Sequence, residues 1–132
     1  MAHSFHVAML ALLAGAVGCS LNARGPEQYR DDTAALLETK SAAIKTCYDG
    51  VLRGQPGSQG TVTVRFNVAE ESGRIKDVAV DAARTSAPPP VAECVTREID
   101  GLVLMPPDAR DGHATFVWQF TFRGVPTVGG AS

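Results

Sequence analysis

Residues 61–69 read Thr-Val-Thr-Val-Arg-Phe-Asn-Val-Ala, and this stretch decides the fold. Successive side chains of an extended strand point to opposite faces, so a strict alternation of polar and apolar residues predicts a strand with one buried face. A sheet built from such strands needs helices on its apolar face only. The inward row of this strand is Val62, Val64, Phe66 and Val68.

Two more strands are predicted with the same one-sided pattern. A turn at residues 71–73 follows the first strand, and Gly73 can take a positive φ there at no steric cost. The return strand covers residues 74–83, and its apolar residues change phase, so a bulge or a strand start is expected near Lys76. The third strand covers residues 114–123, with an aromatic row on one face: Phe116, Trp118, Phe120 and Phe122.

Helices are predicted before the first strand and between the second and the third. Residues 27–53 place apolar side chains at three- and four-residue steps, which predicts one long helix. Ser86 is the expected N-cap of the second helix, whose first turn tolerates proline. The predicted fold is therefore α+β, a two-layer sandwich of order α-β-β-α-β. Both helices cover one face of a three-stranded antiparallel sheet of spatial order two-one-three.

The first residues differ in composition from the rest. No Asp, Glu, Lys or Arg precedes Arg24, and residues 7–17 form a continuous run of apolar and glycine residues. This run is shorter than the roughly 20 residues that span a bilayer, and it fits the apolar core of a signal peptide. The small residues before Cys19 resemble a lipobox, in which the cysteine is lipidated and becomes the mature N-terminus. Leu is usual where Ala16 stands, and the n-region has no Lys or Arg, so an ordinary secretory signal cleaved nearby is the alternative.

The expected organisation has four parts: signal peptide 1–19, tether 20–26, folded domain 27–123 and flexible tail 124–132. Ser20, rather than Asp, follows Cys19. By analogy with enteric sorting, this residue indicates the periplasmic face of the outer membrane. A protein free in the periplasm and an inner-membrane-anchored protein are the alternatives.

Three cysteines are present, which is an odd number for an exported protein. If Cys19 carries lipid, an even pair remains, and an oxidising periplasm favours a disulfide between Cys47 and Cys94. Each of these two lies within the apolar stripe of a predicted helix, so the bridge would clip the helices together. Two buried thiols are the alternative, since thiols behave as small hydrophobes.

The sequence offers little chemistry beyond this. The formal net charge is −2 and no Lys- or Arg-rich run occurs, so no nucleic-acid partner is expected. Asp108, Asp111 and His113 could in principle ligate a metal. The same residues also read as a solvated loop, in which Arg110 would repel a cation. We therefore expect no metal, no cofactor and no catalytic residue.

Six short segments together carry a family resemblance: Ile44–Tyr48, Gly60–Phe66, Gly73–Ile75, Val91–Ile99, Met105-Pro106 and Trp118–Phe122. They resemble the TonB-type C-terminal domain over about residues 36–123. The closest likeness is to its cysteine-containing variety, the AgmX/PglI C-terminal domain, which is associated with myxobacterial gliding-motility proteins. The resemblance implies a periplasmic domain without enzymatic activity that pairs a β-edge with an extended partner segment.

The resemblance favours a lipid-anchored interaction module over an energy transducer, because no transmembrane helix or long proline-rich spacer is present. One alternative is a structural or assembly lipoprotein of the cell envelope, such as a gliding-motility component. The other is an enzyme or small-ligand carrier. The partner is expected to be a cell-envelope protein, and the oligomeric state stays open.

The outer edge of the third strand is the predicted partner-binding site. Its exposed face is almost free of charge, which is weak protection for an edge and suits pairing with an extended segment. Two alternatives are that the C-terminal tail folds back over the edge and that two copies pair there. The residues assigned to this edge are Thr115, Val117, Gln119, Thr121 and Arg123.

Overall fold

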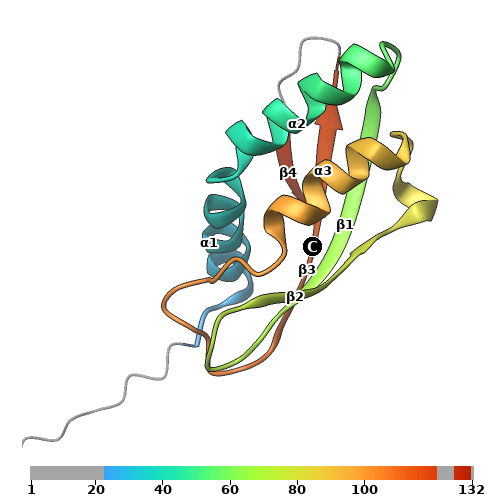
Figure 1. The fold of residues 1–132 in the computed structure, drawn as a ribbon. Helices are drawn as coiled ribbons and strands as arrows, with labels where there is room; N and C mark the ends of the chain where they lie inside the picture. The colour runs from blue at the N-terminus through green and yellow to red at the C-terminus, as the bar shows by residue number, and fades with distance from the viewer. Residues whose placement is uncertain (1–22, 122–126, 132) are drawn as a thin grey trace, which may run out of the picture.

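The structure is a computed structural model that describes residues 23–121 and 127–131. Its sheet is antiparallel, in the order β2-β1-β3-β4 (Figure 1). The α+β class and the order of the first three strands are as predicted from the sequence. The elements are α1 (Pro26–Glu38), α2 (Ser41–Gly54), β1 (Gly60–Val68), β2 (Ile75–Val80), the short 3-10 helix η1 (Ala82–Arg84), α3 (Pro89–Ile99), β3 (Gly112–Phe120) and β4 (Thr127–Ala131).

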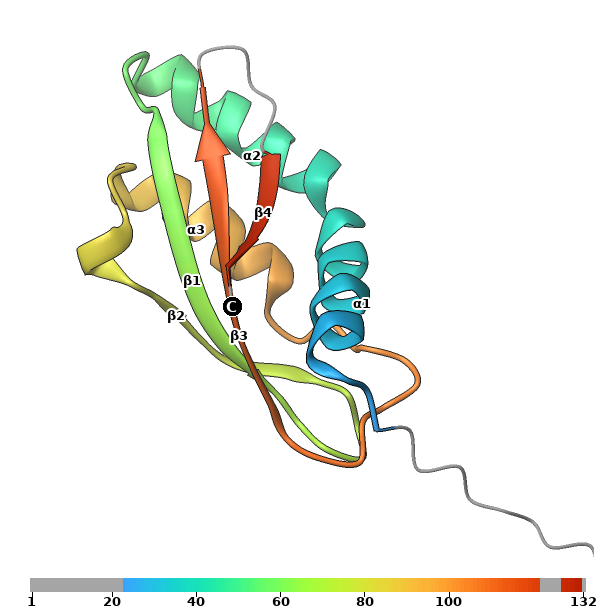
Figure 2. The same ribbon diagram turned by 180° about the vertical axis from the view of Figure 1, so that it is seen from behind.

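Helices α2 and α3 cover one face of the sheet, and the view from behind shows the opposite face (Figure 2). The inward rows of β1 and β3 form the core between the layers, as their alternation predicts. Trp118 and Val64 are fully buried, and Tyr48 of α2 is fully buried against Phe120 with ring centroids 4.8 Å apart. Phe122 lies outside the described residues.

The single helix expected over residues 27–53 is wrong in one respect, because the chain forms two helices. The N–H groups of Thr39 and Lys40 donate to the carbonyls of Leu36 and Leu37, and the Thr39 hydroxyl donates to Leu36 at 2.6 Å. These three-residue bonds close the last turn of α1. The break lets α1 run along the β4 side of the sheet, while α2 stays against α3 (Figures 1 and 2).

The return strand contains the predicted bulge near Lys76. Its register with β1 skips between Arg65 and Asn67, and Asp77 has a φ of 54°. In the preceding turn, Gly73 has a φ of 66°, and a Cβ there would collide with the Leu104 carbonyl. The strand ends at Val80 rather than at residue 83, and η1 follows it.

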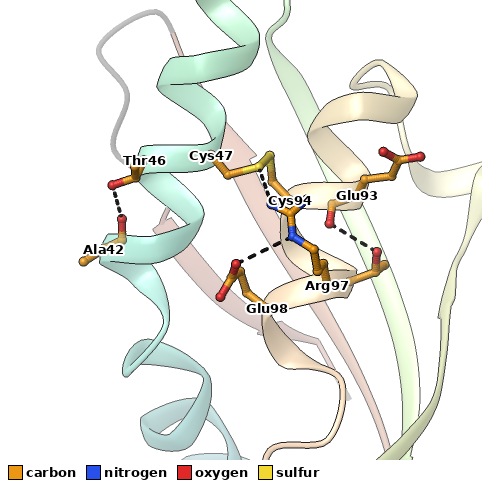
Figure 3. The surroundings of a disulfide bond; sticks show 8 residues. Ala42, Thr46, Cys47, Glu93, Cys94, Arg97 and Glu98 are labelled. Carbon is orange, nitrogen blue, oxygen red and sulfur yellow. Dashed lines mark hydrogen bonds and ion pairs between the residues drawn. A yellow bond between two sulfur atoms is a disulfide. The ribbon is translucent and has the colours of Figure 1, made fainter.

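The disulfide between Cys47 and Cys94 is present and joins the middle of α2 to the middle of α3 (Figure 3). Its Cα atoms are 5.6 Å apart, within the usual range for a disulfide. The N-cap prediction for Ser86 is wrong, because α3 begins at Pro89 and the Ser86 hydroxyl instead accepts a bond from the Thr61 N–H at 2.9 Å.

Both ends of the domain extend further than the sequence predicts. Arg24 was assigned to the tether, yet it is 4% exposed, and α1 begins at Pro26. Residues 127–131 were assigned to a flexible tail, yet they form β4 and pair with β3. Pairing satisfies edge groups of β3 that would otherwise be left without partners in the sheet.

Candidate functional site

The predicted partner-binding residues lie on and just beyond β3. Thr115, Val117 and Gln119 belong to the strand, and Thr121 is exposed directly after its end. Cys19 and Arg123 lie outside the described residues, so the structure places neither of them.

The hydrogen bonds of β1 determine which main-chain groups of β3 point toward its outer edge. Thr63 of β1 uses its N–H and carbonyl on the β2 side, bonding Thr85 Oγ1 at 3.0 Å and the Asp81 N–H at 2.8 Å. Its cross-strand partner on the other side is Val117. Because Thr63 turns its main-chain groups away from β3, those of Val117 point away from β1, toward the outer edge.

The same rule applies to every second residue of β3. Thr61 also bonds on the β2 side, to Ser86 and Ala87, and its partner on β3 is Gln119. Thr115 and His113 follow at the same period. Thr115, Val117 and Gln119, which the sequence selected as the nearly uncharged exposed row, are therefore residues whose N–H and carbonyl groups point outward.

In the structure β4 occupies this edge. Its register pairs Gln119 with Thr127, Val117 with Gly129 and Thr115 with Ala131. The alternative in which the C-terminal segment folds back over the edge is therefore the arrangement that the structure shows. A partner strand at this edge would have to replace β4.

The opposite edge of the sheet is poorly suited to strand addition. The bulge at Asp77 interrupts β2, and Lys76 and Asp77 are exposed charged residues. Bulges and charges are common means by which proteins block edge pairing. At the start of β2, Arg74 already forms a bridge with Val103. The β3 edge is thus the better candidate of the two.

A cavity of about 840 Å³ lies around the start of β3. Residues 112–116 line it from β3, residues 65–67 from β1, and Asp77 and Ala79 from β2. The segment around the start of α1 and the loop before β3 contribute the rest. A Cβ at position 112 would collide with the Tyr29 phenol, so glycine fits there and larger residues do not. The cavity therefore extends across β2, β1 and the start of β3.

Arg24 and Asp108, which are both buried and line this cavity, form an ionic cluster with the partly exposed Asp32. The side-chain Nε of Arg24 contacts Asp32 Oδ2 at 2.6 Å, and the main-chain N–H of Arg24 donates to Asp108 Oδ2 at 3.0 Å. Burial, followed by the charge of Asp108, raises the pKa of Tyr29 to about 12, although Arg24 opposes the shift. Sequence reasoning missed this cluster, because Arg24 and Asp108 are 84 residues apart and no local pattern pairs them.

The three residues considered as metal ligands have separate roles. Asp108 belongs to the ionic cluster, Asp111 Oδ1 accepts a bond from the Glu70 N–H at 2.8 Å, and His113 Nδ1 lies 2.6 Å from Asn67 Oδ1. Over the described part of the chain, no group of three or more His, Cys, Asp or Glu side chains could hold a metal ion.

Comparison of the chain with protein-family models, curated proteins and solved structures gave no match. The fold and the site define a class: a small α+β domain with an antiparallel sheet and helices packed against it. One outer edge of this sheet is covered by the chain's own last strand. None of the helices described is long and apolar enough to cross a membrane.

Proposed function

We propose that this chain is a lipid-anchored, non-catalytic interaction module of the bacterial cell envelope, similar to TonB-type C-terminal domains. It binds an extended segment of a partner protein by strand addition at β3, in exchange for β4. The observation that carries the proposal is the row of outward main-chain groups on β3, which is covered only by a five-residue strand.

The composition of β4 supports exchange. Its sequence is Thr-Val-Gly-Gly-Ala, and glycine weakens a strand because it has no side chain to pack and loses much backbone entropy. Its covalent link to β3 supplies a high effective concentration, which favours the closed form without strong contacts. A partner segment with β-branched residues in the same register would pair more favourably.

The disulfide supports placement in the envelope, because such bonds persist in oxidising compartments. The second candidate is a structural envelope lipoprotein in which β4 closes the edge permanently. The pairing of β4 with β3 favours this alternative. The two candidates differ in whether a strand from another molecule can bind at the β3 edge.

A peptide with the sequence of residues 124–132 is a direct probe of this edge. Gly129 pairs with Val117, so its N–H points at β3, and Gly129→Pro removes that donor and should release β4. Val128 pairs with Trp118, whose groups face β1, so the N–H of Val128 points away from β3. Val128→Pro is therefore the matched control.

Fluorescence anisotropy with the labelled peptide should detect saturable binding to full-length Gly129→Pro and much weaker binding to Val128→Pro. Adding Val117→Pro to Gly129→Pro should abolish the signal, whereas adding the turn substitution Ser72→Ala should not. Equal binding by the Gly129→Pro and Val128→Pro variants would count against strand addition at this edge. No binding by either variant would count against it too and would favour the closed scaffold.

A further inference from the structure

The two halves of the disulfide between α2 and α3 differ in their exposure to solvent. Cys94 is fully buried on the inner side of α3, whereas Cys47 is partly exposed on α2. A thiol that opens a disulfide attacks one of its two sulfur atoms directly. In the folded domain, Cys47 is therefore the member of the pair that an external thiol can reach.

A guanidinium contacts the sulfur atom of this exposed half. Arg97 of α3 donates from Nη2 to Cys47 Sγ at 3.2 Å, and its side chain is 65% exposed (Figure 3). The attacking form of a thiol is the thiolate, which is an anion. An arginine side chain stays charged and donates hydrogen bonds, so Arg97 attracts an approaching thiolate to Cys47.

The charged groups nearest to Arg97 only partly offset its charge. Glu98 lies 3.8 Å from Arg97, but it also lies 3.9 Å from Lys40 of the preceding turn. On α2, Lys45 and Asp49 pair with each other at 2.6 Å. Three cations and two carboxylates thus surround the exposed side of the bond, which leaves a net positive charge there.

We propose that Cys47 is a thiol-exchange site at which an anionic thiol opens and re-forms the disulfide. The thiolate forms a new S–S bond with Cys47 Sγ, and the electron pair of the old bond leaves on Cys94 Sγ, which takes a proton from water. A second thiolate attacks the sulfur atom of the first and releases Cys47 as a thiolate beside Arg97. The reverse sequence, starting from the disulfide of the same thiol, closes the bond, and two electrons pass in either direction.

Reduction kinetics of the oxidised, folded protein test this proposal. The full-length chain carries Cys19→Ser, so that the two cysteines of the bond are the only ones present. Glutathione, which is anionic, is compared with cysteamine, which carries an ammonium group. Because attack occurs in the folded state, the rate should rise with thiol concentration and stay nearly constant in urea below the unfolding transition.

Arg97→Gln should slow reduction by glutathione about threefold and reduction by cysteamine clearly less, because Arg97 attracts the net negative charge of glutathione. Arg97→Lys keeps the charge and should retain most of the wild-type rate. The matched control is Arg53→Gln, which removes a positive charge from the last turn of α2 and should leave both rates unchanged. In samples quenched with acid during reduction, the glutathione adduct should lie on Cys47.

An adduct on Cys94 would overturn the proposal. So would the absence of slowing by Arg97→Gln, or slowing that is equal for the two thiols. A rate that climbs steeply with urea would also overturn it, since the bond would then open only in unfolded chains. None of these results bears on strand addition, because the exchange site does not involve the β3 edge.

Discussion

Tyr29 connects the start of α1 to the start of β3. Its phenol packs in the space that a side chain at position 112 would need, and its hydroxyl lies beside the Arg24–Asp108 pair. Burial and the Asp108 charge both favour the neutral phenol, which is why the pKa of Tyr29 rises to about 12 from 10.0. The residue therefore makes a local contribution to the pH dependence of folding.

The free energy of unfolding should fall between pH 10 and 12 more steeply in wild type than in Tyr29→Phe. The pKa of the Tyr29 phenol is higher in the folded state than in the unfolded state. Its contribution to the free energy of unfolding is therefore complete below pH 10 and is lost as the pH rises through 12. At pH 7 the substitution should be nearly neutral, because the hydroxyl has no partner among the described residues. Urea unfolding at several pH values measures both effects, and parallel stability curves for the two proteins would refute this assignment.

Residue patterns in the sequence predict the core and miss the ionic cluster for a physical reason. The inward row of β1 follows from period-two alternation, which is local. Arg24 is buried only because Asp32 and Asp108 compensate its charge, and the second of these is brought near by the folding of the whole chain. Such compensation leaves no signal in the sequence around Arg24.

Among the helices and strands, β1 and β3 follow the prediction, whereas the predicted helix over residues 27–53 divides into α1 and α2 and β4 is not predicted. The bulge near Lys76 is visible as a change of phase, while the break at Thr39 depends on side-chain and main-chain bonds in one turn. β4 has two glycines among five residues, so its own composition does not predict a strand. It forms because an open edge lies beside it.

The disulfide between α2 and α3 should be a major source of stability. It closes a loop across a sequence separation of 47 residues, and losing a native disulfide from a small exported domain typically costs about 2–5 kcal/mol. Reduction or the double substitution Cys47→Ser/Cys94→Ser should therefore lower Tm clearly. Thiol titration of the unfolded, non-reduced mature protein should find neither cysteine free, and two titratable thiols would contradict the bond.

At the scale of the whole molecule, the burial of Arg24 limits how far the start of β3 can lie from Cys19. Arg24 lines the cavity, and only four residues lie between it and Cys19, so the two Cα atoms are at most about 18 Å apart. If Cys19 is lipidated as proposed, the start of β3 lies close to the bilayer. The partner segment must then be presented at the membrane surface.

Lipidation at Cys19 is the prediction on which this orientation depends. Several acyl chains would hold the domain firmly, since a single chain anchors only marginally. Metabolic labelling with an alkyne fatty acid should mark wild type and leave Cys19→Ser unlabelled. Equal labelling of the two proteins would show that the lipid is attached elsewhere or that the signal is of another type.

We propose above that the β3 edge exchanges β4 for a partner strand in the cell envelope. A photo-crosslinking amino acid at position 119, whose side chain is exposed, tests it directly in native envelopes. Strand exchange predicts one discrete adduct that Gly129→Pro increases, Val128→Pro leaves unchanged and Val117→Pro removes. An adduct that is indifferent to all three substitutions, in protein that remains folded, would contradict the claim.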